Sequence, residues 1–212
     1  MCLFNPVNPQ LWAKETVFIL GGGNSVTGED LLILSRQKNV IGVNDSALRA
    51  KTGSLFSLDR TWINVRKDDI RHKFSGRKFF ALKQNDPIDR SQYPNTTWLE
   101  KVNDTTWPHP HQIFGYNSGF GAVILAAHGG ASQIVLVGFD MGVIGNKEHW
   151  HHGYYWAHGQ PNTRYKRWAE QFENNLHYFT EKNINIINAS VNSNIDCFPK
   201  APLAEVILSD AG

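Results

Sequence analysis

The sequence predicts an α/β fold: a single Rossmann-like domain over residues 1–212, with a mostly parallel sheet and helices on both faces. Three observations lead to this prediction. Short apolar, β-branched segments recur along the chain, segments with helical spacing separate them, and a glycine or a polar residue follows most of the apolar segments. Strands that alternate with helices favour a parallel sheet, because a crossover helix returns the chain to the start of each new strand.

The first 60 residues are expected to supply three strands and two helices. Each strand is a run of four or five mainly apolar residues, which is typical of a strand buried on both faces. The strands are expected at Thr16–Leu20, Val40–Val43 and Leu55–Leu58, and the helices at Glu29–Gln37 and from Ser46 onward.

The section from about 61 to 113 has weaker patterns, and we expect an irregular insert that forms an edge of the sheet or a small lid. Prolines exclude helix at Trp107–His111, because proline lacks the amide donor and restricts the residue before it. Regular structure within the section is expected at Trp62–Ile70 (helix), Lys78–Leu82 (strand) and Thr97–Val102 (strand).

The last hundred residues return to clear alternation. Small apolar residues fill 118–129, which predicts a helix that packs closely on the sheet. The remaining elements are expected at Gln133–Phe139 (strand), Arg164–Lys182 (helix), Asn185–Asn188 (strand) and Leu203–Leu208 (helix).

Composition excludes several classes of function. The formal charge is +2 and charged residues make up 19%, so no bulk charge favours nucleic acid or an anionic membrane. Cys2 and Cys197 lie far apart and lack metal-binding spacing, which predicts neither a disulfide framework nor a zinc site. The N-terminus lacks signal-peptide features, and no apolar run approaches the ~18 residues of a membrane span. We therefore expect a cytoplasmic protein, with homo-oligomers left open.

The chain is organised around the turn Gly21-Gly22-Gly23-Asn24-Ser25, between the first strand and the first helix. Glycines at such a turn let an anion approach backbone N–H groups at the positive end of a helix dipole. The alternative is a tight turn that binds nothing.

Four other strand ends or helix starts carry candidate ligand-binding residues, each with a structural alternative. Asn44 and Asp45 could bind a ribose or a base edge, or cap a helix. Asp59 could bind a sugar hydroxyl or a metal ion, or cap a helix.

Asn117, Ser118 and Gly119 could receive phosphate or carboxylate, or form a plain cap. Gly138 and Asp140 follow the clearest strand, where Asp140 could also accept backbone N–H bonds. Ligands of parallel sheets bind beyond the carboxyl ends of the strands, so these residues are expected to meet.

The segment from His149 to His158 is rich in histidine and aromatic residues. Imidazole titrates near neutral pH, so a histidine general acid or base is favoured here. The tract could also bind a metal ion, although no convincing helical spacing supports that, or simply pack over the cleft. We predict no metal ligands.

Four motifs in order, Leu20–Ser25, Gly42–Asn44, Asn117–Gly119 and Ile134–Asp140, resemble the bacterial lipooligosaccharide sialyltransferases and the wider sialyltransferase-like group. That group includes the motility-associated glycosyltransferases and the hydroxymethylpterin pyrophosphokinases. The chain departs from it at Asn24, at Asp59 and at Met141-Gly142, where the group has proline, asparagine and a tyrosine pair.

The resemblance implies a metal-independent glycosyltransferase that moves a sugar from a nucleotide-activated donor, such as a CMP-linked sugar, to a hydroxyl-bearing acceptor. Residues 21–25 would contact phosphate and ribose, Asn44 the nucleotide, and Ser118 and Gly119 the donor carboxylate or phosphate. His158 would be the general base, with His151 or His152 as substitutes. Two alternatives remain: a pyrophosphokinase in which Asp59 and Asp140 hold Mg²⁺ and ATP is the donor, and a nucleotide-binding module without catalysis.

Overall fold

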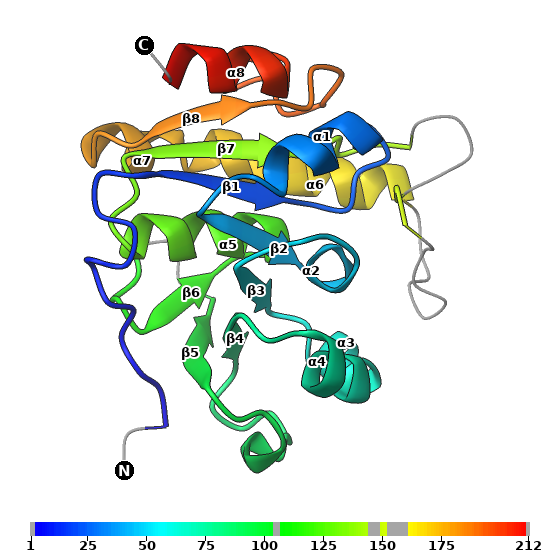
Figure 1. Cartoon of the computed structure of the whole chain (residues 1–212). Helices are drawn as coiled ribbons and strands as arrows, with labels where there is room; N and C mark the ends of the chain where they lie inside the picture. Colours follow the sequence, from blue (N-terminus) through cyan, green and yellow to red (C-terminus); the bar gives the residue numbers. More distant parts are fainter. Residues whose placement is uncertain (1–2, 104–106, 144–148, 152–160, 211–212) are drawn as a thin grey trace.

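The computed structural model describes residues 3–103, 107–143, 149–151 and 161–210. Within these ranges the chain forms an eight-stranded sheet in which every neighbouring pair is parallel, with the order β6-β5-β4-β3-β2-β1-β7-β8 (Figure 1). Helices cover both faces of this sheet. The predicted Rossmann-like α/β fold is confirmed, and the sheet is parallel throughout rather than mostly parallel.

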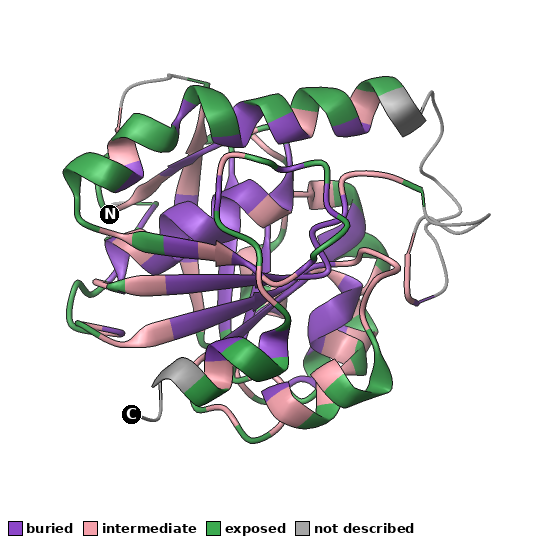
Figure 2. Cartoon of the chain, turned by 90° about the horizontal axis from the view of Figure 1, so that it is seen from above, coloured by how far each residue is buried: buried purple, intermediate pink, exposed green. Residues whose placement is uncertain are grey.

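The strands coincide with the apolar segments of the sequence. Most of their central residues are buried, since helices cover both faces of the sheet (Figure 2). They are β1 (Thr16–Leu20), β2 (Val40–Val43), β3 (Ser54–Ser57), β4 (Arg77–Leu82), β5 (Thr96–Val102), β6 (Gln112–Phe114), β7 (Gln133–Val137) and β8 (Asn185–Asn188).

The helices follow the expected places, with some shifts at their ends. The long helix expected at 164–182 is divided in two, because the helical hydrogen-bond pattern is interrupted at Asn175. The helices are α1 (Gly28–Leu34), α2 (Asp45–Arg49), α3 (Arg60–Val65), α4 (Lys67–Lys73), α5 (Ser118–His128), α6 (Pro161–Asn174), α7 (Leu176–Glu181) and α8 (Leu203–Asp210), with a 3₁₀ turn at Arg90–Gln92.

Three groups of buried side chains define the layers. The largest lies between the sheet and α5, α6 and α7. The other two lie on the opposite face, where α1 and α8 cover β1 and β7, and α2, α3 and α4 cover β3 and β4. None of the described helices is both long and apolar enough to cross a membrane.

The section 61–113 differs from the expected irregular insert. It contributes α3, α4 and three consecutive parallel strands, and β6 forms one edge of the sheet. The three-residue strand β6 follows the proline-rich stretch and pairs with β5 through Lys101 opposite Ile113. It was not predicted, because three residues are too few for a periodic pattern to register.

The chain reverses its direction of travel across the sheet at β1. Strands β2 to β6 extend to one side of it, whereas β7 and β8 lie on the other. Leu20 at the end of β1 is therefore flanked by Gly42 of β2 and Val137 of β7. Loops that diverge from such a point leave a crevice at the carboxyl edge of the sheet, where doubly wound folds bind ligands.

Candidate functional site

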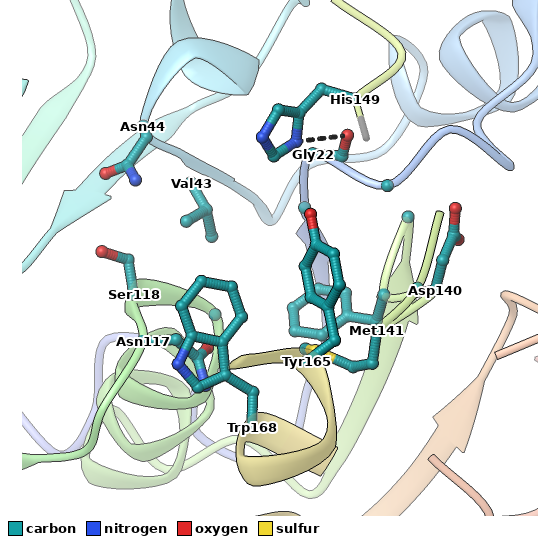
Figure 3. A pocket seen from close by; sticks show the side chains of 16 residues that line it. Gly22, Val43, Asn44, Asn117, Ser118, Asp140, Met141, His149, Tyr165 and Trp168 are labelled. Atoms are coloured by element: carbon teal, nitrogen blue, oxygen red, sulfur yellow. Dashed lines mark hydrogen bonds between the residues drawn. The ribbon is translucent and has the colours of Figure 1, made fainter. Parts of the chain in front are cut away.

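A narrow cavity of about 130 Å³ opens at the reversal point, and it brings together most of the predicted site residues (Figure 3). A wider cavity of about 530 Å³ adjoins it and shares six of its lining residues. The narrow cavity alone is smaller than the roughly 300–1,000 Å³ of usual ligand sites, but the two together fall in that range. The shared residues are Asn44, Asn117, Ser118, His149, Tyr165 and Trp168.

The glycine turn lines the narrow cavity through Gly21, Gly22 and Gly23, and it packs tightly against the loop after β7. A Cβ atom on Gly21 would lie 2.5 Å from the Gly138 carbonyl oxygen, and one on Gly23 would lie 2.6 Å from Cγ of Asp140. The Gly21 and Gly23 N–H groups donate to the carbonyls of Val137 and Gly138, both at 2.8 Å. Close packing therefore accounts for at least two of the three glycines, and these two N–H groups are already bonded within the protein.

Asp140 holds the far end of the same turn. Its carboxylate accepts the Ser25 backbone N–H at 2.8 Å and also the Ser25 hydroxyl. Asp140 is buried and lines the narrow cavity, but Figure 3 shows its carboxylate directed away from the other labelled side chains. The structural alternative for Asp140 accounts for these contacts, and neither Asn24 nor Ser25 is among the residues that line the two cavities.

Asn44 behaves differently from a helix cap. It makes no side-chain cap hydrogen bond to α2, and its backbone has φ 53° and ψ −128°, a region that glycine dominates. Its Oδ1 atom is buried and has no hydrogen-bond partner among the described residues. A strained backbone together with an unpaired amide oxygen at a cavity wall is typical of a ligand-binding residue.

Asn117 and Ser118 join the start of α5 to the cavity. Asn117 Oδ1 caps the helix by accepting the Phe120 N–H at 2.8 Å, whereas Nδ2 is buried and unpaired within the described part of the chain. The Ser118 hydroxyl accepts the Leu58 N–H at 3.2 Å. Gly119 lies against Phe139, where a Cβ would approach a ring carbon to 2.7 Å. Asn117 thus combines the capping role with an amide donor that a ligand could use.

Two of the predicted carboxylates have structural partners. Asp45 is 1% exposed, and its carboxylate accepts Nε1 of Trp62 at 2.8 Å and two nitrogens of Arg66 at 2.9 Å each. It lines neither cavity, in contrast to the expectation that it contacts a nucleotide. Asp59 caps α3 through the Trp62 N–H at 3.1 Å, and it lines the wider cavity.

The first residues of the histidine tract contact the glycine turn. Nδ1 of His149 lies 3.2 Å from the Gly22 carbonyl oxygen, and Nε1 of Trp150 donates to the Gly21 carbonyl at 3.1 Å. The rings of His149 and His151 stack with their centroids 5.1 Å apart. His149 lines both cavities and His151 lines neither, whereas His152 and His158 lie outside the described residues.

Helix α6 supplies an aromatic wall that the sequence did not assign to the site. Tyr165 and Trp168 line both cavities, and their rings meet edge to face at 5.6 Å. Figure 3 shows them facing Asn44 and His149 across the cavity. The helical spacing of Trp168 predicts a core residue, and Phe172, one turn further on, is fully buried. Only the packing of α6 against the sheet distinguishes the two positions.

Among the described residues, no group of three or more histidine, cysteine, aspartate or glutamate side chains could hold a metal ion. Asp59 and Asp140, the two carboxylates proposed for Mg²⁺ in a pyrophosphokinase, line different cavities. Each carboxylate also accepts a backbone N–H.

No protein-family model and no curated protein sequence matches this chain. A solved structure does. The fold is similar to that of the MAf glycosyltransferase from Magnetospirillum magneticum AMB-1, with a TM-score of 0.68 at 10% sequence identity. The match covers 93% of this chain and 35% of the other, so the chain spans about a third of the length of that protein. At this identity the similarity shows a shared fold.

Replacement of Asp45 by alanine should lower the free energy of unfolding by roughly 3 kcal/mol, because it leaves Arg66 and the Trp62 N–H without their buried acceptor. Urea denaturation measures the loss. Asp68→Ala is the matched control, because Asp68 is exposed and lies in α4 beside the same arginine. A loss for Asp45→Ala no larger than the control's would contradict the structural role.

Proposed function

We propose that the chain is a glycosyltransferase that binds a nucleotide-activated sugar in the two joined cavities at the carboxyl edge of the sheet. The observation that carries this proposal is the pair of amide groups on the shared wall. Asn44 Oδ1 is an unpaired acceptor and Asn117 Nδ2 an unpaired donor within the described residues. Neutral amides suit the hydroxyl groups and base edges of a nucleoside or sugar, because they offer directed hydrogen bonds without a desolvated charge.

The aromatic wall supports the same ligand class. Trp168 and Tyr165 present ring faces and edges opposite the amides, and flat sugar or base rings pack well against such groups. The glycosyltransferase-like fold and the four motifs that resemble the sialyltransferase-like group favour transfer of a sugar, with a CMP-linked donor as the first candidate.

A histidine of the tract that follows β7 supplies the general base in this proposal. The resemblance indicates His158, which would remove the proton from the acceptor hydroxyl while the sugar–phosphate bond breaks. His149 contributes to binding, since an Nδ1–H group donated to the Gly22 carbonyl would fix its ring at the wall of both cavities. The chemistry then needs only the base, a positioned donor and stabilisation of the departing phosphate.

A thermal-shift screen of CMP, CDP, UDP, GDP, AMP and ATP, each with and without Mg²⁺, tests the ligand class. A nucleotide at 100 times its Kd should add about 2.7 kcal/mol to the stability of the native state. We expect a shift with CMP or CDP that does not need Mg²⁺. A shift with ATP that requires Mg²⁺ would favour the pyrophosphokinase, and no shift with any of the six would overturn the nucleotide site.

Replacement of Asn44 by glycine should weaken nucleotide binding about tenfold or more while leaving the free energy of unfolding unchanged or higher. The change removes the amide but relieves an unfavourable φ/ψ combination. Calorimetric titration and urea denaturation measure the two effects. Asn95→Gly is the matched control, because Asn95 is exposed, has φ 57° and lies in neither cavity. Unchanged nucleotide affinity in Asn44→Gly would remove Asn44 from the site.

Replacement of His158 by glutamine should lower kcat by about 10²–10⁴-fold and leave the nucleotide affinity close to that of the wild type, as expected for a general base. His149→Gln should instead lower the affinity. Donor turnover and titration with the nucleotide found in the screen separate the two. Full turnover in both variants would mean that the chain uses another base, whereas no turnover in the wild type would mean that it is a binding module.

A further inference from the structure

The wider cavity contains a set of charged side chains that the proposed function does not use. It lies over the carboxyl ends of three neighbouring strands, β3, β4 and β5, beside the narrow cavity. Four cationic side chains line it: Arg60 after β3, Lys83 after β4, Lys101 near the end of β5, and Arg164 of α6. Two carboxylates, Asp59 and Asp86, line it as well.

Lys101 is a partly buried lysine of β5. It lies on the same face of β5 as the fully buried Leu99. Its side chain makes a single hydrogen bond within the described part of the chain, a weak one of 3.5 Å from Nζ to the Leu58 carbonyl oxygen. No described carboxylate lies within ion-pair distance of its ammonium group. Burial lowers the pKa of Lys101, while the nearby Asp59 and Asp86 raise it and Lys83 lowers it. A partly buried ammonium without a close counter-ion is unfavourable unless a ligand supplies the negative charge.

Both carboxylates of the cavity already accept a hydrogen bond from a backbone N–H group. Asp59 accepts the Trp62 N–H at 3.1 Å and Asp86 accepts the Lys83 N–H at 2.9 Å. Among the described residues, the side chains of Arg60 and Lys83 form no ion pair and no hydrogen bond. No described carboxylate therefore pairs directly with the charge of Arg60, Lys83 or Lys101, three of the four cationic groups of the cavity.

We propose that the wider cavity is an anion subsite, in which Lys101 binds a phosphate or carboxylate group of a substrate and Arg60 and Lys83 hold its outer oxygens. That this anion belongs to a substrate rests on the proposed function. The N–H groups of Gly21 and Gly23 already donate to backbone carbonyls, so they are not available to bind a phosphate. This favours a phosphate position in the wider cavity rather than at the glycine turn. The anion belongs either to the nucleotide donor or to an acidic acceptor.

Isothermal titration of Lys101→Met with inorganic pyrophosphate, CMP and cytidine tests the subsite. We expect pyrophosphate affinity to fall about 10- to 100-fold, as for loss of a hydrogen bond to a charged group, and cytidine affinity to stay unchanged. Lys78→Met is the matched control. Lys78 is a buried lysine of the neighbouring strand β4, its pKa is also lowered by burial, and it lines neither cavity.

The results separate the subsite from the proposed function and identify the source of the anion. Weaker CMP binding in Lys101→Met assigns the anion to the donor, whereas loss of pyrophosphate binding with unchanged CMP binding assigns it to the acceptor. Lys101-dependent pyrophosphate binding in a protein that binds no nucleotide would keep the subsite and overturn the nucleotide site. The subsite is overturned if pyrophosphate does not bind the wild type, or if it binds the wild type and Lys101→Met equally, whatever the nucleotides do.

Urea denaturation of Lys101→Met checks the fold. We expect its stability to match or exceed that of the wild type, since a partly buried charge is removed.

Discussion

The close approach of two loops at the reversal point of the sheet is the contact on which the candidate site depends. The turn after β1 and the turn after β7 touch backbone to backbone, and a single added Cβ at Gly21 would meet the Gly138 carbonyl oxygen at 2.5 Å. Asp140 then fixes Ser25, and the segment 149–151 binds the outer carbonyls of the same turn. With these loops fixed, the remaining strand ends surround a cavity of defined shape.

The two joined cavities differ in chemistry because they lie over different strands. The narrow one lies where β1, β2 and β7 end, and neutral amides, glycines and aromatic rings form most of its wall. The wider one lies over β3, β4 and β5, where charged side chains follow each strand. A ligand that bridges them would present a neutral ring system to one end and an anionic group to the other. Nucleotide-activated sugars and acidic acceptors both have this division.

Several predicted site residues proved to stabilise the fold, and the reason is physical. Asp and Asn at strand ends are favoured both as ligand groups and as helix caps, so the residue type alone leaves the two roles open. Asp59 and Asn117 cap helices and also line a cavity, whereas Asp45 is enclosed by Trp62 and Arg66. Asn44 differs from them because it makes no side-chain cap hydrogen bond and has a strained backbone.

Local patterns in the sequence predict the alternation of strands and helices, the glycine turn and the carboxyl edge as the place of the candidate site, because these depend on local periodicity and on the general topology of parallel sheets. Tertiary structure decided which side chains meet there. Trp168, Tyr165 and Lys101 come from a helix and an outer strand whose patterns read as core or surface, and only the packing of α6 and the position of β5 bring them to the cavities. Distances between segments far apart in the chain are set by how whole layers pack, and no local pattern encodes them.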